Sequence, residues 1–335
     1  MAKQQPREQE QQLIAQMLEF QDDPLSFVLY AFPWGKANSP LENAKGPRGW
    51  QVEALTEMRD HLARNRNKTR QQLDPELLKI AIASGRGIGK SAFLAWIALW
   101  LFSCVPSSTV IVSANTEQQL KSTTFPEIRK WATMAIHANW FEHNAMSLRP
   151  ADWLVQSLKA TTEYDDAYWY IQARLWSEES PDAFAGVHSQ KGMAVLFDEA
   201  SGIPSVIWPV TQGYFTDKTV HRFWVAISNP RNPSGAFFEC FNANRDTWWN
   251  RTVDARSVNE NDQALYQQII KQYGTDSDEA RVEVYGMFPR QGDQQFISRG
   301  EVDDAIAREV DTDNGAPLLM GVDPARFGDD EAVIA

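Results

Sequence analysis

Cysteine and long apolar segments are scarce in this sequence of 335 residues. Its 2 cysteines, Cys104 and Cys240, are too few for a disulfide framework in a chain of this length. The longest apolar run, Ala92 to Cys104, is shorter than the ~20 residues that cross a bilayer. The polar N-terminal stretch MAKQQPREQEQQ lacks the apolar core of a secretory signal. We therefore expect a soluble protein of a reducing, cytosolic compartment, with no membrane contact and no cleaved export signal.

Positive charge is also in deficit, because 32 Lys and Arg face 44 Asp and Glu and the formal net charge is -12. No global positive field would draw the chain to nucleic acid, although the basic cluster HLARNRNKTR (61–70) could act locally. Internal repeats and low-complexity segments are absent from the sequence. The 43% of hydrophobic residues can fill a sizeable core, so we expect one large domain and a smaller region.

Short apolar runs alternate with helical segments in the middle of the chain. The runs are LLKIAIAS (77–84), STVIVSAN (108–115), YWYIQARLW (168–176), GMAVLFDEA (192–200) and HRFWVAISN (221–229). Continuous apolar runs separated by helices are typical of a parallel sheet that is covered on both faces. The sequence therefore predicts an α/β fold with a parallel central sheet.

The segments on either side of this alternation have a different character. Residues 1–48 read as a helix and a loop-rich lead-in. Amphipathic helical patterns, NDQALYQQIIKQYG (261–274) and RGEVDDAIAREV (299–310), follow the sheet and predict a smaller helical region. The stretch APLLMGVDPARFGDDEAVIA (316–335) indicates new strands.

A phosphate-binding loop is predicted by IAIASGRGIGKSAFLAWIALW (80–100), which has the order strand, Gly-rich turn, Lys-Ser, helix. Backbone N–H groups at the start of a helix can surround an anion there. Lys90 would neutralise the β- and γ-phosphates, and Ser91 would bind Mg²⁺. Ser84 departs from the usual pattern, which has glycine at that position. The predicted nucleotide-binding residues of the loop are Gly85, Arg86, Gly87, Ile88, Gly89, Lys90 and Ser91.

Two further strand ends carry polar residues suited to phosphate chemistry. GMAVLFDEA would deliver Asp198 to the Mg²⁺ and Glu199 to the water that attacks the γ-phosphate. FWVAISNP would place Ser228 and Asn229 near the γ-phosphate, where they could sense its presence. An adjacent Asp-Glu pair favours ATP hydrolysis over transfer to a small acceptor.

These motifs, in this order, resemble the large terminase subunit of tailed bacteriophages. The matching stretches are GWQVEAL (49–55), SGRGIGKS (84–91), VIVSANTEQQLKS (110–122), PDAFAGVHSQKGMAVLFDEASGIP (181–204), AISNPRNPSG (226–235), RVEVYGMFP (281–289) and GVDPARFGDDEAVI (321–334). The resemblance implies a RecA-like (ASCE) P-loop ATPase domain over 49–250, after the lead-in at 1–48. A helical linker subdomain over 251–315 and the first strands of an RNase H-like nuclease domain over 316–335 would follow.

The resemblance also implies roles for individual residues. Gln51 looks like an adenine-reading glutamine, Ser228 and Asn229 look like a coupling motif, and Arg86 would contact the γ-phosphate or pair with Glu199. An arginine from a neighbouring subunit usually completes such motors, often from just before the glycine that is Gly186 here. This chain has Ala185 at that point, which leaves Arg149, Arg174 and Arg231 as candidates.

Asp323 would be one Mg²⁺ ligand of the two-metal nuclease. The other carboxylates would lie downstream, so we expect a truncated nuclease domain without cutting activity in this chain.

The leading hypothesis is thus an ATP-hydrolysing motor that uses Mg²⁺ and packages double-stranded viral DNA into a procapsid. Its expected partners are the small terminase subunit, the portal protein and further copies of itself in a ring. The expected location is the cytoplasm of the infected bacterial host. Two alternatives are another DNA-dependent P-loop ATPase, such as a helicase, and an inactive prophage remnant that only binds packaging components.

Overall fold

The computed structural model describes residues 8–159, 166–258 and 261–290, together with 305, 307, 308, 322, 323, 333 and 334. The chain divides into a compact unit that ends at Gly292 and a second unit that begins at Asp293. No helix within these described ranges is both long and apolar enough to cross a membrane.

An eight-stranded sheet forms the centre of the first unit, in the order β3-β4-β5-β2-β6-β7-β1-β8. Its strands are β1 (Leu78–Ser84), β2 (Thr109–Ala114), β3 (Phe141–His143), β4 (Ser147–Pro150), β5 (Tyr170–Ala173), β6 (Gly192–Asp198), β7 (His221–Ser228) and β8 (Trp249–Val253). Six neighbouring strands of this sheet, β5, β2, β6, β7, β1 and β8, are parallel to one another. Strands β3 and β4 add an antiparallel edge beside β5.

The five predicted apolar runs all form strands of this sheet, which confirms the predicted α/β class. Strand β7 lies between β1, which leads into the Gly-rich loop, and β6, which ends at Asp198. The carboxyl ends of parallel strands meet at one edge, so the three polar motifs are brought together there.

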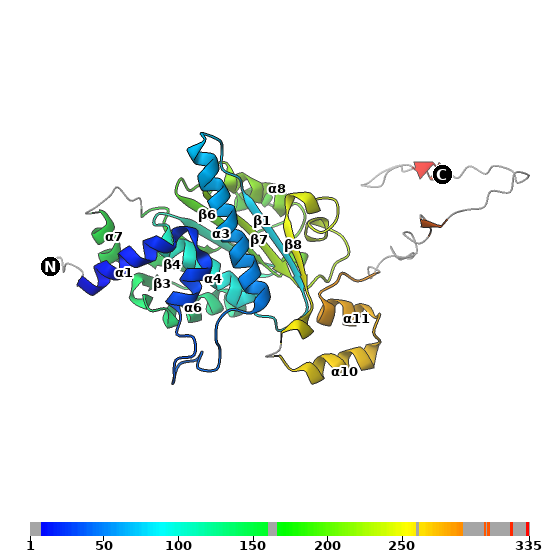
Figure 1. Ribbon diagram of the computed structural model, residues 1–335. Coiled ribbons are helices and arrows are strands. Elements are labelled where there is room, and N and C mark those ends of the chain that lie inside the picture. The colour runs from blue at the N-terminus through cyan, green and yellow to red at the C-terminus, as the bar shows by residue number, and fades with distance from the viewer. Residues whose placement is uncertain are drawn as a thin grey trace, which may run out of the picture. The chain divides into compact units, whose positions relative to one another are not determined.

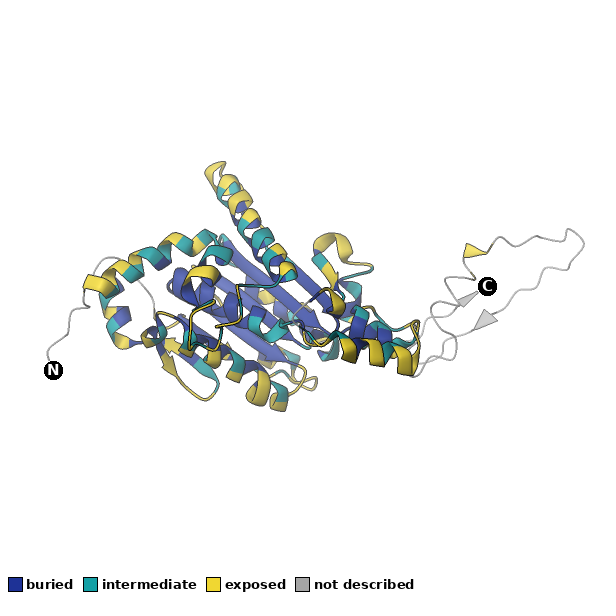
Figure 2. Ribbon diagram, turned by 60° about the horizontal axis from the view of Figure 1, so that its bottom comes forward, coloured by how far each residue is buried: buried dark blue, intermediate teal, exposed yellow. Residues whose placement is uncertain are grey.

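Helices cover both faces of the sheet (Figure 1). The helices of the first unit are α1 (Glu8–Glu19), α2 (Pro24–Ala31), α3 (Gly49–Arg70), α4 (Lys90–Cys104), α5 (Glu117–Gln119), α6 (Phe125–Met134), α7 (Asp152–Lys159), α8 (Ile207–Gln212), α9 (Ala236–Glu239), α10 (Gln263–Tyr273) and α11 (Asp278–Ala280). The side chains of β1, β2, β5, β6 and β7 alternate between two hydrophobic clusters, one under α1 to α4 and α6 and the other under α8 and α9. Figure 2 shows the resulting contrast between the buried sheet and the exposed outer helix surfaces.

Helix α4 is apolar around its whole circumference and is buried from Phe93 to Cys104. A helix of this kind needs cover on every side. The N-terminal helices supply part of that cover, since Met17 and Phe27 are fully buried in the same cluster and the Trp100 indole donates to the Phe20 carbonyl. The predicted lead-in is therefore packed onto the core of the first unit.

The sheet continues past residue 250, because β8 pairs with β1 along Ile80 to Ser84. The boundary predicted at residues 250–251 thus falls inside a strand. Helices α10 and α11 follow, in the region predicted to be a helical linker. In the second unit, strands β9 (Val322–Asp323) and β10 (Val333–Ile334) form an antiparallel pair, and the predicted helix at 299–310 lies largely outside the described residues.

Candidate active site

The Gly-rich loop connects β1 to α4 and uses glycine where its backbone demands it. Gly87 and Gly89 have φ of 77° and 86°, in the left-handed region that other residues seldom adopt. No side chain caps α4, so the N–H groups of its first turn face the loop without a side-chain partner at the cap. Ser84 is tolerated at the unusual position because it is still the last residue of β1 and does not have positive φ.

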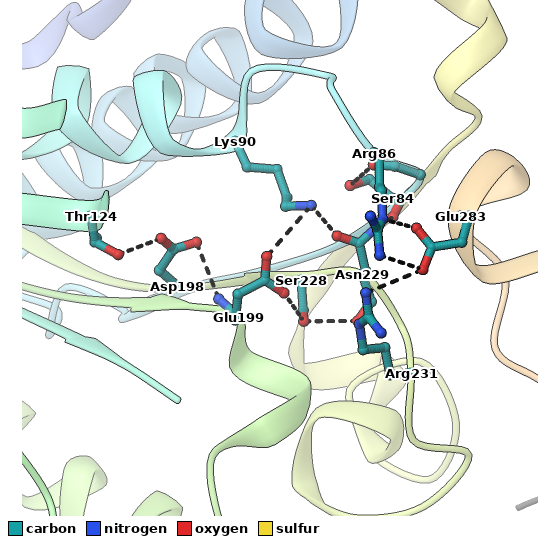
Figure 3. A network of polar contacts seen from close by, with 11 residues as sticks. Ser84, Arg86, Lys90, Thr124, Asp198, Glu199, Ser228, Asn229, Arg231 and Glu283 are labelled. Carbon is teal, nitrogen blue, oxygen red and sulfur yellow. Dashed lines mark hydrogen bonds and ion pairs between the residues drawn. The ribbon is translucent and has the colours of Figure 1, made fainter. Parts of the chain in front are cut away.

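Lys90 begins α4 and points across the sheet edge toward β7 (Figure 3). Its ammonium donates to Asn229 Oδ1 at 2.5 Å and lies 3.9 Å from Glu199 Oε1. The Asn229 amide in turn donates to the carbonyl of Ser84 at 2.8 Å. Burial lowers the pKa of Lys90, against the opposing attraction of nearby carboxylates.

Asp198 and Glu199 lie at the end of β6. Asp198 is buried, and burial raises its pKa to about 6, which the hydrogen bond from Thr124 offsets only in part. Glu199 has φ of 49° and ψ of 46°, a left-handed conformation that is uncommon for glutamate and is found mainly where surrounding structure imposes it. The chain turns sharply there, so the two neighbouring carboxylates point in different directions.

Ser228 joins the ends of β6 and β7. Its hydroxyl lies 3.2 Å from Glu199 Oε2 and 2.8 Å from the Asn229 carbonyl oxygen. The predicted coupling pair therefore contacts both the predicted catalytic carboxylate and the loop lysine. The sequence placed Glu199, Ser228 and Asn229 at strand ends and Lys90 after the Gly-rich loop, and the structure connects these four residues in one network.

The residues present fit a magnesium ion bound with phosphate. The hydroxyl of Ser91, in the first turn of α4, and the carboxylate of Asp198 are oxygen ligands, the kind that Mg²⁺ prefers. The opposite pKa shifts of Lys90 and Asp198 share one cause, burial, and both would be offset by bound charge. Among the described residues no cluster of three or more His, Cys, Asp or Glu could hold a metal. Such a cluster is not needed where phosphate oxygens complete the shell.

Arg86 pairs with Glu283 in this structure, and not with Glu199, which was one of the two partners predicted for it. Its guanidinium donates to Glu283 Oε1 at 3.0 Å, and its backbone N–H donates to the Glu283 carbonyl at 2.9 Å. Arg231 shares the same carboxylate at 3.1 Å. The contact with Glu283 was not predicted, because Glu283 follows α11, far along the sequence, and only the tertiary fold brings it to the loop (Figure 3). Contact of Arg86 with a γ-phosphate stays a prediction.

Gln51 is buried in the first turn of α3, where it braces the loop. Its amide donates to the Gly89 carbonyl at 3.0 Å, and its Oε1 accepts the Arg48 N–H at 2.8 Å. Arg48 also donates to the Gly87 carbonyl at 2.7 Å, and Tyr266 of α10 donates to the Arg86 carbonyl at 2.8 Å. A nucleotide-reading role for Gln51 stays a prediction, whereas its contact with the loop is observed.

A hollow of about 410 Å³ opens beside Glu199. Its lining is polar and comes from the ends of β2, β6 and β7: Asn115, Thr116, Gln119, Glu199, Ser201, Gly202, Ser228, Arg231 and Asn232. A larger hollow of about 890 Å³ lies at the opposite ends of the strands, near Ser107, Gln190 and Asp217. We assign the site to the smaller hollow, because the Gly-rich loop and the buried carboxylates lie at that edge.

The three candidate arginines have separate surroundings. Arg174 donates to the carbonyls of Ala183 and Ala185, Arg149 lies over the Tyr170 ring, and Arg231 pairs with Glu283. Asp323 forms part of β9, but its side chain lies outside what the structure describes.

Several contacts of the site were not predicted from the sequence: those of Arg48, Thr124, Tyr266 and Glu283. Thr124 and Glu283 lie in or next to stretches that resemble terminase motifs, which was the only signal available for them.

The sequence of this chain is similar to that of a known terminase subunit. No protein-family model matches the chain. A probable terminase large subunit of Enterobacteria phage P7 is 26% identical over 264 residues, which are 76% of this chain and 51% of that protein. The chain therefore spans about half the length of this curated relative. The resemblance to large terminase subunits is confirmed by this match.

Two solved structures of large terminases are similar to part of this chain at low sequence identity. A large terminase of a thermophilic bacteriophage, solved with ADP, has 12% identity and a TM-score of 0.47 over 80% of this chain and 54% of its own. The large terminase ATPase domain of Thermus phage P74-26 has 16% identity and a TM-score of 0.43, over 67% of this chain and 98% of its own.

Proposed function

We propose that this chain is the ATPase part of a motor that packages double-stranded viral DNA, in the manner of a large terminase subunit. The observation that carries the proposal is the convergence of Lys90, Asp198, Glu199 and Asn229 at one sheet edge. The similarity to a probable terminase large subunit supports the choice of DNA packaging among the processes driven by ATPases.

The residues divide the work of hydrolysis among them. Lys90 and the loop N–H groups bind the β- and γ-phosphates, and Ser91 and Asp198 would hold Mg²⁺, which neutralises phosphate charge. Glu199 faces the polar hollow, where it can orient a water and accept its proton. A γ-phosphate competes with Asn229 for the Lys90 ammonium, so Asn229 and Ser228 can transmit the presence of nucleotide to β7.

The polar hollow beside Glu199 leaves room for a group supplied by a neighbouring subunit. Arg231 is engaged by Glu283, and Arg174 is bound to backbone carbonyls, so neither is directed at Glu199 by its present contacts. We propose that the chain acts as a ring in the infected bacterial cytoplasm, with DNA, the portal protein and a small terminase subunit as partners. A nuclease function involving Asp323 belongs to the same proposal, for the whole protein.

Phosphate release from ATP by the purified chain tests the core of this proposal. Wild type with Mg²⁺ should release phosphate, and Asp198→Asn should not, because an amide is a poor Mg²⁺ ligand in place of a carboxylate. Equal release by the two proteins would remove the assignment of this site.

A further inference from the structure

Thr124 lies on the irregular helix that follows β2. Helices α5 and α6 are joined by a π-helical turn, Leu120–Thr124, and Thr124 is its last residue. The side chain is buried, with 1% of its surface exposed, and its hydroxyl donates to Asp198 Oδ2 at 2.6 Å (Figure 3). π-Helical turns are rare and often occur at functional sites.

Other hydroxyls of the same helical run are used differently. Ser122 and Thr133 donate to the backbone carbonyl four residues earlier, as Ser and Thr in helices commonly do. Thr124 instead reaches a carboxylate that is 74 residues distant in the sequence. Its hydroxyl is thus directed at the site.

The contact completes a two-point support for Asp198. Oδ2 accepts from Thr124, and Oδ1 accepts from the backbone N–H of Glu199 at 3.1 Å. Two donors on different elements fix the rotation of the carboxylate. An ionised carboxylate has about four acceptor positions, so each oxygen keeps one for a further partner.

We propose that Thr124 is a positioning residue, which orients Asp198 for the Mg²⁺ that accompanies the nucleotide. The inference rests on the proposed ATPase function and adds a residue to its site. Hydrogen bonds from outside a metal shell orient the ligands within it, and their removal commonly costs about 10–100-fold in metal affinity or activity.

The test measures ADP binding by calorimetry, in EDTA and over a series of Mg²⁺ concentrations. Thr124→Val keeps the shape of the side chain and removes the hydroxyl. It should raise the Mg²⁺ concentration needed for half-maximal enhancement of ADP binding by about 10–100-fold. Affinity in EDTA should stay close to wild type, and Thr124→Ser should restore most of the Mg²⁺ response. Thr123→Val is the matched control, because Thr123 is adjacent and exposed.

Other results would overturn either the positioning role of Thr124 or the proposed ATPase function. Wild-type Mg²⁺ response in Thr124→Val, or equal loss of binding with and without Mg²⁺, overturns the positioning role. Failure of wild type to bind ADP with Mg²⁺ removes the proposed function itself. Should Thr124→Val not fold, judged by circular dichroism, Thr124→Ala replaces it, and a normal Mg²⁺ response in that variant overturns the inference.

Discussion

The two sides of the candidate site are built in different ways. The Gly-rich loop is clamped from outside by Arg48, Tyr266 and the backbone carbonyl of Glu283, which belong to segments before and after the sheet. The side that carries Glu199 instead borders a polar hollow of about 410 Å³. One side holds a fixed shape, and the other leaves room for a reacting group.

This difference follows from what each side would do in the proposed reaction. Backbone donors bind phosphate well only if their directions are set in advance, and the external clamps provide that rigidity. Hydrolysis needs access for water and, in a ring, for a neighbour's side chain. Changes on the clamped side should therefore affect binding, and changes on the open side should affect turnover.

The largest effect is expected on the clamped side, from Lys90→Ala. ATP should bind weakly and turnover should therefore fall below detection, because the phosphate charge would be left to backbone amides and Mg²⁺ alone. Phosphate release by the purified variant provides the measurement. Lys191→Ala, in the larger hollow at the opposite edge, is the control and should keep full activity. Near-normal turnover by Lys90→Ala would contradict the phosphate-loop assignment.

Assembly should act through the open side. A dilute monomer should hydrolyse ATP slowly, and a ring should be faster by about 10³–10⁵-fold, the value of a supplied arginine. Turnover measured against protein concentration, with light scattering to report the oligomeric state, would show the rise. Full activity in a protein that remains monomeric would contradict a contribution from the neighbour.

Glu199→Gln should separate turnover from binding. The amide keeps the shape but cannot accept a proton from water, so hydrolysis should fall by about 10²–10⁴-fold. ATP affinity, measured by calorimetry, should be retained because the loop is untouched. Glu117→Gln, at an exposed ion pair, is the control. Loss of binding together with turnover would indicate that Glu199 supports the structure of the site.

A smaller effect is expected from Glu283→Gln, which removes the ion pairs but keeps the clamping hydrogen bond from the Arg86 backbone N–H to the carbonyl of residue 283. Arg86 and Arg231 would be freed from the carboxylate, and Arg86 could then meet the phosphates. Both arginines are more than half exposed, so the pairs hold them by at most about 1 kcal/mol each. ATP should bind up to about fivefold more tightly, with Glu279→Gln as the exposed control. Weaker binding would mean that the pairs maintain the loop conformation.

Asp22 lies outside both sides of the candidate site, so the smallest effect on activity is expected from Asp22→Asn. Burial alone would raise the pKa of Asp22, but hydrogen bonds and charge from His221 and Arg66 outweigh it and hold that pKa well below its usual range. The contribution to stability is therefore present above pH ~4, the unfolded pKa, and is lost as the pH falls below it. The variant should lose about 1 kcal/mol near neutral pH.

Urea unfolding at several pH values measures this loss. The difference in free energy of unfolding between wild type and Asp22→Asn should become smaller as the pH falls below ~4. ATP turnover at neutral pH should stay unchanged. A difference in free energy of unfolding that stays constant with pH would exclude the charge of the Asp22 carboxylate as its source.

The sequence alone determined five of the eight strands of the sheet and the polar residues that follow them. Apolar runs of strand length specify burial on both faces. Asp198, Glu199 and Asn229 lie at the ends of two such runs, and Lys90 follows the Gly-rich loop after a third. The position of each residue relative to its strand is enough to predict that these residues meet, because the carboxyl ends of parallel strands share one edge of the sheet.

Only the tertiary structure decided what surrounds those residues. Glu283 reaches Arg86 across 197 positions, and Thr124 reaches Asp198 across 74. No periodicity or motif spacing records such contacts, because they depend on how helices pack after the sheet has formed. Glu199 in its left-handed conformation is a further case, since its own preference opposes the turn that the surrounding fold imposes.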